Sequence, residues 1–208
     1  MIVLGLTGSI GMGKTTAAGH LRRLGIPVYD ADDAVHRLVA KGGAAVPLIE
    51  QAFPHTVFGG AVERSRLGAR VFADDEALKR LEGILHPLVR REERRFVERG
   101  RRERRRLVAL DIPLLLETGG HHVDVVAVVS CPAFLQEQRV MSRHGMTHGK
   151  LQAVRRRQMA DREKRRRADF VIPTGAGRRL SLVRLKAVVR LLFGAPRRHR
   201  CRRMPRHA

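Results

Sequence analysis

The feature that most constrains this chain is a glycine-rich stretch near its N-terminus. Residues 8–15 read Gly-Ser-Ile-Gly-Met-Gly-Lys-Thr and match the phosphate-binding pattern G-x-x-x-x-G-K-[ST] at every defined position. An apolar run at residues 2–6 predicts a buried strand before it, and residues 16–24 predict a helix after it. This order brings backbone N–H groups together at a helix N-terminus, where they bind phosphate. We therefore expect a nucleotide-binding P-loop.

The residue types inside this loop predict how it handles a nucleotide. Lys14 is expected to reach the β- and γ-phosphates of the nucleotide, and the Thr15 hydroxyl is expected to hold Mg²⁺. Gly8, Gly11 and Gly13 let the backbone turn tightly and approach the anion. The expected cofactor is therefore Mg²⁺, bound together with a nucleotide.

Length and composition favour one α/β unit in the cytoplasm. A chain of 208 residues can bury a good core. The apolar opening has no basic flank and does not resemble a signal peptide, and no apolar run is long enough to span a bilayer. Cys131 and Cys201 lie far apart in the sequence, so both are interpreted as reduced thiols.

The formal net charge of +22 raises the question of a nucleic-acid partner. Arginine supplies nearly all of this charge, and its densest run, residues 90–106, interleaves glutamates at the spacing typical of a solvated helix face. With one tyrosine and no tryptophan, the chain lacks the stacking platforms of single-strand binders. We expect no specific nucleic-acid partner; a general phosphate-attracting field and a dedicated nucleic-acid site are the alternatives.

Strand-like and helix-like segments alternate along the chain. Four further strands are expected, at residues 26–29, 107–110, 123–129 and 170–172. Helix-rich sections at residues 34–100 and 133–167 separate them, and a last helix at residues 180–193 is expected to pack against the sheet rather than lie on a membrane. This order predicts a P-loop NTPase-type α/β fold of three layers, α/β/α, with a five-stranded parallel sheet. Ligands of such sheets bind outside the carboxyl ends of the strands.

Carboxylates follow two of these strands, at the edge of the sheet where ligands are expected. Phosphoryl transfer to a hydroxyl requires a carboxylate that positions or deprotonates the acceptor. After the second strand, one of Asp30 and Asp32 is expected to point at the site while the other caps the next helix, with capping alone as the alternative. Asp111, after the third strand, resembles a Walker B residue, so binding of Mg²⁺ through water competes with substrate binding as its role.

Two histidine features have plainer interpretations. His86 precedes Pro87, and because a residue before proline avoids the α conformation, this pair can mark the end of a helix. His121, His122 and Asp124 suggest a metal site, but no further ligand follows at a convincing spacing. We interpret them as a loop.

Several motifs together make the chain similar to the dephospho-CoA kinases, the last enzymes of coenzyme A synthesis. Beside the P-loop stretch at residues 5–16, they are Asp-Ala-Asp at residues 30–32, a segment with a His-Pro pair at residues 81–87, and Asp-Ile-Pro-Leu-Leu-Leu-Glu at residues 111–117. The spacing of the family's lid and following strand is matched by Gln136, Arg139, Arg143, Gln158, Lys164 and Ala168-Asp169. The resemblance covers residues 1 to about 177.

The resemblance implies ATP-dependent phosphorylation of the ribose 3′-hydroxyl of dephospho-CoA. Asp32 would activate that hydroxyl, Lys14 would act on the phosphates, and Arg139 would close over them from a mobile lid. The other residues implied at the ATP site are Gly8, Gly11, Met12, Gly13, Thr15, Thr16 and Arg143. Further contacts to the substrate are implied for His86, Asp111, Pro113, Leu114 and Glu117.

The resemblance also implies a domain organisation. A single domain would cover residues 1–194, with a tail of basic character expected to be disordered at residues 195–208. Its parts would be a core (1–32, 101–132 and 168–194), a helical substrate lobe (about 33–100) that holds the pantetheine side, and a helical lid (about 133–167). The oligomeric state is not predicted.

Two positions depart from the family pattern, and two other functions compete. His144 stands where many relatives have aspartate, and Pro173 stands where an aspartate is common after the last strand. A nucleoside or nucleoside-monophosphate kinase shares the P-loop and fold, and a nucleic-acid-stimulated ATPase is suggested by the charge. Consumption of ATP with dephospho-CoA, with nucleosides and nucleotides, or with nucleic acid would separate the three.

Overall fold

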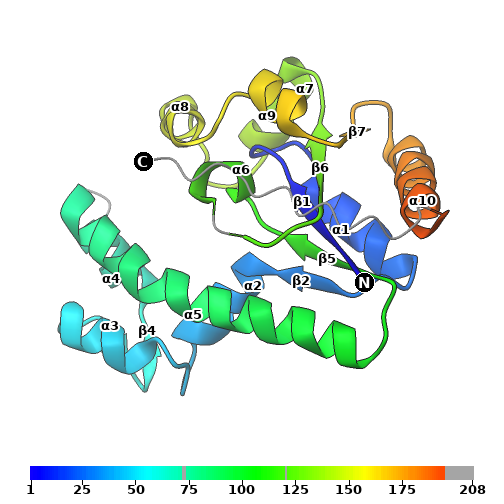
Figure 1. Cartoon of the computed structure of the whole chain (residues 1–208). Coiled ribbons are helices and arrows are strands. Elements are labelled where there is room, and N and C mark those ends of the chain that lie inside the picture. Colours follow the sequence, from blue (N-terminus) through cyan, green and yellow to red (C-terminus); the bar gives the residue numbers. More distant parts are fainter. Residues whose placement is uncertain (72–73, 120, 195–208) are drawn as a thin grey trace. The chain divides into compact units, whose positions relative to one another are not determined.

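The computed structural model describes residues 1–71, 74–119 and 121–194, so the expected tail and Cys201 lie outside the described residues. The chain divides into two compact units (Figure 1). The first comprises Met1–Tyr29 with Arg99–Ala208, and the second comprises Asp30–Glu98. We describe each unit by itself.

A five-stranded sheet forms the centre of the first unit. Its strands are β1 (Ile2–Thr7), β2 (Val28–Asp30), β5 (Leu107–Asp111), β6 (Val125–Ser130) and β7 (Phe170–Pro173), in the order β2-β5-β1-β6-β7. The β1 strand pairs in parallel with β5 and β6, and β6 pairs in parallel with β7. The expected parallel sheet is confirmed. Pro173 ends the edge strand β7, a position where a missing N–H is tolerated.

Helices cover both faces of this sheet. Leu4 and Leu6 of β1 belong to an apolar cluster with Leu21 of α1 (Lys14–Arg23) and Leu185 of α10 (Arg178–Gly194). Because successive strand residues alternate between faces, Gly5 points the other way. A Cβ at Gly5 would lie 2.5 Å from Leu115 Cδ2 of α6 (Leu115–Thr118). The three layers are thus confirmed, as is the packing of the last helix.

The section after β6 forms three short helices, α7 (Ala133–Met141), α8 (His148–Arg157) and α9 (Asp161–Arg167). The α9 helix contacts β6, and Ser130 Oγ at the end of that strand donates to Asp161 Oδ2 at 2.8 Å. Figure 1 shows the three helices at the top of the view, beyond the upper end of β6. The basic section is therefore helical, as expected.

The second unit contains α2 (Ala31–Val39), α3 (Val46–Ala52), α4 (Arg64–Val71) and most of α5 (Asp75–Arg102), whose residues from Arg99 on belong to the first unit. A hairpin of β3 (Val57–Phe58) and β4 (Ala61–Val62) was not expected. Its turn residues Gly59 and Gly60 have φ of 58° and 80°, which glycine adopts readily.

Pro87 does not end a helix, so the interpretation of His86 as a helix terminus was wrong. The α5 helix of 28 residues runs through Pro87. Leu81 and Val89, one on each side of the proline, are both buried. Burial of apolar side chains along the helix outweighs the one backbone hydrogen bond that proline removes, which costs about 3 kcal/mol.

Residues 121–124 form a loop that ends at the start of β6. The loop was expected at the two histidines, whereas the strand was expected to begin two residues earlier, at residue 123. The Asp124 carboxylate accepts a hydrogen bond from Val3 N at 2.8 Å, and Asp124 N donates to Val3 O at 2.9 Å. These contacts fasten the loop to β1. Within the described residues, no three His, Cys, Asp or Glu side chains are grouped closely enough to hold a metal ion.

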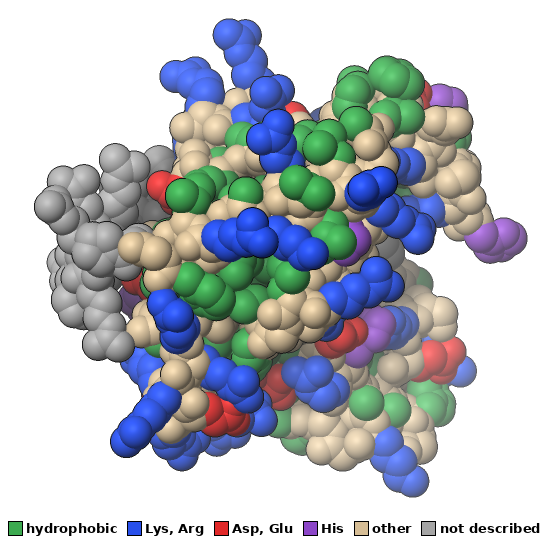
Figure 2. Space-filling model, turned by 90° about the vertical axis from the view of Figure 1, so that its right-hand side faces the viewer, with side chains coloured by type: hydrophobic (Ala, Val, Ile, Leu, Met, Phe, Trp, Pro, Cys, Tyr) green, Lys and Arg blue, Asp and Glu red, His purple; other side chains and the backbone are tan. Residues whose placement is uncertain are grey.

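The arginine excess is spread over the surface. The run that begins at Arg90 lies in the C-terminal half of α5, where Arg91, Arg94 and Arg95 are exposed. Lys and Arg side chains are distributed over the face seen in Figure 2, with hydrophobic side chains between them. No helix in the described part of the chain has the length and apolar character needed to cross a membrane.

Candidate active site

Residues 8–13 connect β1 to α1 and form the P-loop. Met12 N donates to Ser9 O at 3.1 Å and closes a tight turn, and Gly13 caps α1 with a φ of 90°. Gly8 is required for a reason that the sequence did not show. A Cβ there would lie 2.8 Å from Val129 O, so the loop passes too close to β6 for any side chain.

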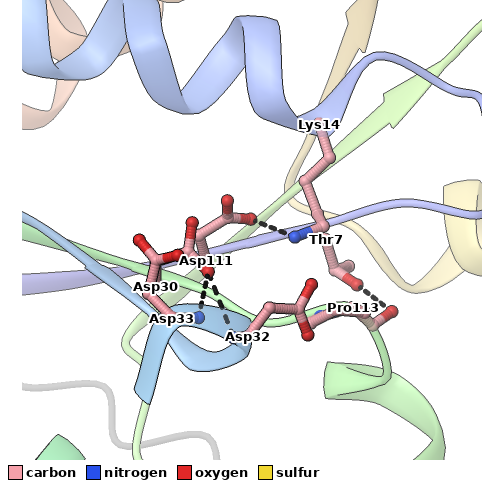
Figure 3. A network of polar contacts seen from close by, with 7 residues as sticks. All are labelled: Thr7, Lys14, Asp30, Asp32, Asp33, Asp111 and Pro113. Carbon is pink, nitrogen blue, oxygen red and sulfur yellow. Dashed lines mark hydrogen bonds and ion pairs between the residues drawn. The ribbon is translucent and has the colours of Figure 1, made fainter. Parts of the chain in front are cut away.

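Lys14 and Asp111 form an ion pair beside this loop (Figure 3), with Lys14 Nζ 2.8 Å from Asp111 Oδ1. The register of β1 with β5 pairs Leu6 with Asp111, which places the carboxyl end of β5 next to the start of the loop. The Asp111 side chain is 1% exposed and that of Lys14 15%. A buried carboxylate requires such a partner, because burial of an unpaired charge is costly.

The segment after Asp111 is fastened to the end of β1. Ile112 N donates to Leu6 O at 3.0 Å, and Thr7 Oγ1 donates to Pro113 O at 3.0 Å (Figure 3). Leu114 follows as the N-cap of α6. Asp111 and Pro113 belong to the motif at residues 111–117, and these contacts place both beside the P-loop. Substrate contacts were predicted for both residues.

Thr15 and Thr16 lie in the first turn of α1. Thr15 is exposed, and Thr16 is partly buried.

Met12, by contrast, is 3% exposed and packs in the core, with its Sδ 3.5 Å from Cys131 Sγ. Burial raises the pKa of the Cys131 thiol above its ordinary value, and the positive charge of Arg139 opposes this shift. The side chain of Met12 therefore belongs to the core, and contact of Met12 with a nucleotide stays a prediction.

Arg139 reaches the P-loop through one intermediate residue. From α7 its Nη2 donates to Thr174 O at 2.8 Å, and Thr174 Oγ1 donates to Met12 O at 2.6 Å. Thr174 directly follows β7 and was not singled out from the sequence. Its place at the carboxyl end of a strand is the signal that could have found it. Arg143 and His144 lie beyond the end of α7 and are both exposed.

Glu117 has a partner inside the protein. Its Oε1 lies 2.7 Å from Nζ of the fully buried Lys164 and accepts from Met159 N at 3.0 Å. These contacts join α6 to the start of α9. Contact of Glu117 with a substrate stays a prediction.

The remaining predicted site residues belong to the second unit. Asp30 ends β2 and caps α2, accepting from Asp32 N at 3.1 Å and Asp33 N at 3.3 Å (Figure 3). The capping role expected for one aspartate of the pair is therefore that of Asp30. Asp32 is exposed in the first turn of α2, and His86 is exposed in α5.

Two glutamines contact the P-loop, although the sequence had shown only their spacing. Gln136 Nε2 donates to Ile10 O at 2.8 Å, and Ile10 N donates to Gln158 Oε1 at 3.0 Å. Neither contact has a local sequence signal, because the partners are 126 and 148 residues apart.

Comparison with known proteins identifies the family of this chain. The family model for dephospho-CoA kinase matches residues 2–177. A dephospho-CoA kinase of Paramagnetospirillum magneticum is 62% identical over 196 residues, which are 94% of this chain and 92% of that protein.

Solved structures show the same likeness. The crystal structure of TT1252 from Thermus thermophilus, 39% identical, has a TM-score of 0.78 and covers 93% of this chain and 98% of its own. A dephospho-CoA kinase from Campylobacter jejuni, 24% identical, has a TM-score of 0.69 over 91% of this chain and 96% of its own, and shows the shared fold. The chain therefore belongs to the dephospho-CoA kinase family, and the reaction it catalyses is the ATP-dependent phosphorylation of dephospho-CoA.

Proposed function

We propose that the group phosphorylated is the ribose 3′-hydroxyl of dephospho-CoA, and that the P-loop of this chain supplies the phosphoryl group from ATP. The observation that carries the proposal is the ion pair of Lys14 with the buried Asp111 at the carboxyl ends of β1 and β5. It holds an ammonium beside the phosphate-binding turn, at the edge of the sheet where ligands of this fold bind.

The residues of the first unit account for the donor half of the reaction. The γ-phosphoryl group leaves its bridging oxygen on ADP and forms a bond to the acceptor oxygen, so negative charge shifts toward ADP. Lys14 would stabilise that charge at the β- and γ-phosphates. Arg139, held at the P-loop through Thr174, would approach the same phosphates, with the exposed Arg143 near it.

Mg²⁺ fits the oxygen donors of this site. Mg²⁺ is usually bound by one or two protein oxygen ligands together with the phosphates of the nucleotide and water. The exposed Thr15 hydroxyl in the first turn of α1 would hold the ion. The Asp111 carboxylate, which pairs with Lys14, would contact it through a water molecule. When bound, Mg²⁺ neutralises charge on the phosphates.

Asp32 is proposed as the residue that receives the proton of the acceptor hydroxyl. Asp30 is occupied as the N-cap of α2, whereas the Asp32 side chain is exposed. Asp32 lies three residues after Tyr29, the last residue of β2 that belongs to the first unit. Proton acceptance requires an accessible carboxylate. Further substrate contacts are proposed for His86, Asp111, Pro113, Leu114 and Glu117.

The proposed organisation assigns a substrate to each part of the chain. The helical unit would hold the pantetheine side of dephospho-CoA, and residues 133–167 would cover ATP. The small molecules ATP and dephospho-CoA are the partners, without a specific nucleic acid or a membrane. We place the reaction in the cytoplasm, where ATP is made and the unpaired Cys131 is kept as a thiol.

Asp32→Asn compared with Asp33→Asn tests the acceptor assignment. Both aspartates are exposed neighbours in the first turn of α2, and both donate their backbone N–H to Asp30, so the second variant is a matched control. Asp32→Asn should lower kcat by about a hundredfold or more with little change in ATP affinity, and Asp33→Asn should leave both unchanged.

Phosphorus NMR of the product should show the new phosphate on the ribose 3′ position. Two results would overturn the assignment of Asp32. One is equal activity of the two variants. The other is a loss of ATP binding in Asp32→Asn without a change in kcat, which would move Asp32 to the Mg²⁺ site and leave Asp111 as the acceptor carboxylate.

A further inference from the structure

The main chain of Ile10, in the middle of the P-loop, is bound from two helical elements. Its carbonyl accepts from Gln136 Nε2 of α7 at 2.8 Å, and its N–H donates to Gln158 Oε1 at 3.0 Å. Gln158 is the C-cap residue that directly follows α8. Both peptide groups of one loop residue are therefore held by side-chain carboxamides that lie far away in the sequence.

The orientation of the Gln136 carboxamide follows from its partners. Its Oε1 accepts from Arg155 Nη2 at 3.0 Å. A guanidinium can only donate hydrogen bonds, so the atom facing Arg155 is the oxygen and the NH₂ group faces Ile10. Gln136 is 6% exposed, which keeps water from competing for these bonds. Arg155 thus fixes the direction in which Gln136 donates.

The neighbouring part of the loop is held in the same way. Met12 O accepts from Thr174 Oγ1 at 2.6 Å, so two loop carbonyls each have a side-chain donor. Gly11 lies between them with a φ of 75°, and a Cβ there would lie 2.9 Å from Gln136 O. The α7 backbone therefore packs directly against the loop at this glycine.

A phosphate site of this kind needs several loop N–H groups directed at the anion and carbonyl oxygens directed elsewhere, because a carbonyl oxygen repels a phosphate. The Ile10 N–H faces Gln158, so it is not one of the anion-binding groups, and Gln158 acts on the conformation of the loop alone. We propose that Gln136 and Gln158 are positioning residues for ATP. They hold the Ile10 peptide groups so that the loop keeps the conformation that binds phosphate. Neither needs to touch the nucleotide. This inference rests on the proposed binding of ATP at the P-loop.

The proposal predicts that loss of either glutamine weakens the binding of ATP but not the binding of dephospho-CoA. Gln136→Met and Gln158→Met remove the carboxamides while keeping side-chain size. Each should weaken ATP binding roughly three- to tenfold, the amount expected for one neutral hydrogen bond. The KM for dephospho-CoA and kcat at saturating ATP should each change less than twofold. The double variant should lose less than the product of the two single losses, because both act on one residue.

Gln138→Met is the matched control, because Gln138 lies on α7 beside Gln136 but is exposed. It should bind ATP like the unaltered enzyme. The affinity for ATP is measured by calorimetry without dephospho-CoA, and KM and kcat are then measured for both substrates. Because Gln136 is buried, Gln158→Met, at a half-buried position, keeps the test decisive if Gln136→Met does not fold.

The outcomes separate the possible failures. Weaker ATP binding with an unchanged KM for dephospho-CoA supports the inference. A lower melting temperature with unchanged ATP affinity, or an equal rise of both KM values, overturns it and leaves the glutamines a structural role alone. If the unaltered enzyme does not bind ATP, the proposed function fails, and the inference with it. If that enzyme and Gln138→Met bind ATP and Gln158→Met binds equally well, only the inference fails.

Discussion

The two sides of the P-loop are held by different kinds of contact. On one side, which we call the charged side, Lys14 pairs with Asp111 at 2.8 Å. On the other, the amide side, Gln136 and Gln158 hold Ile10 through neutral hydrogen bonds of 2.8 and 3.0 Å. An ammonium is needed where charge develops during phosphoryl transfer, whereas neutral amides can fix a backbone without adding charge near it. We therefore expect the charged side to act in phosphoryl transfer and the amide side to position the loop.

The largest effect is expected on the charged side, from Lys14→Ala. It should lower kcat by at least about a hundredfold, because a preorganised charge at the transferring group is lost. It should also reduce the free energy of unfolding by about 1–3 kcal/mol, since Asp111 loses a charged partner. Steady-state kinetics and urea unfolding measure the two effects.

Lys79→Ala is a control for Lys14→Ala, because Lys79 is exposed in α5 of the other unit. It should change neither quantity. Near-normal turnover in a folded Lys14→Ala variant would contradict the proposed role of Lys14 in phosphoryl transfer.

Arg139 sharpens the comparison, because it is a charge on the amide side. Its guanidinium contacts Thr174, which binds Met12 O. We expect Arg139→Ala to lower kcat about tenfold or more at every ionic strength, because its charge is proposed to act on the moving phosphoryl group at short range. The exposed Arg156 provides the control, and Arg156→Ala should change at most a salt-sensitive kcat/KM. If saturating ATP restores the rate of Arg139→Ala, Arg139 acts with the glutamines as a positioning residue.

The smallest effect concerns Cys131, whose Sγ lies 3.5 Å from Met12 Sδ beneath the loop. Burial raises its pKa, so the folded protein holds the neutral thiol to higher pH than the unfolded chain does. The stability that this shift contributes is present below the unfolded pKa and is lost as pH rises through the folded one. At about pH 8.5, the unperturbed thiol pKa, iodoacetamide should modify Cys131 more slowly in the folded protein than in urea.

Mass spectrometry of the peptide that contains Cys131 measures this rate. Equal rates in the two states would contradict the buried position of this thiol.

The sequence predicted best what is encoded locally. The strands appear as short apolar runs, and the P-loop motif occupies eight consecutive residues, so both were located within a few residues of where they lie. The β3–β4 hairpin was missed because strands of two residues are too short to show an alternating pattern, although Gly59-Gly60 is a hairpin turn signal. The course of α5 through Pro87 depended on burial, which a local rule does not include.

In the candidate site, sequence motifs identified the charged residues. They did not identify the residues whose side chains bind the P-loop backbone. Lys14 and Asp111 belong to patterns in which residue type and spacing are restricted by phosphate chemistry. Thr174, by contrast, follows no motif, and its contact with Met12 O joins residues 162 positions apart. Such contacts depend on how β7 and α7 fold against the loop. Only a structure shows them.

The choice of acceptor tests the account most directly. The purified enzyme should be given ATP and Mg²⁺ with dephospho-CoA, with a panel of nucleosides and nucleoside monophosphates, and with single- and double-stranded nucleic acid. We predict ADP formation matched one to one by coenzyme A with the first acceptor, and rates near background with all others. Faster phosphorylation of a nucleoside or nucleotide, or ATP hydrolysis stimulated by nucleic acid without coenzyme A formation, would contradict it.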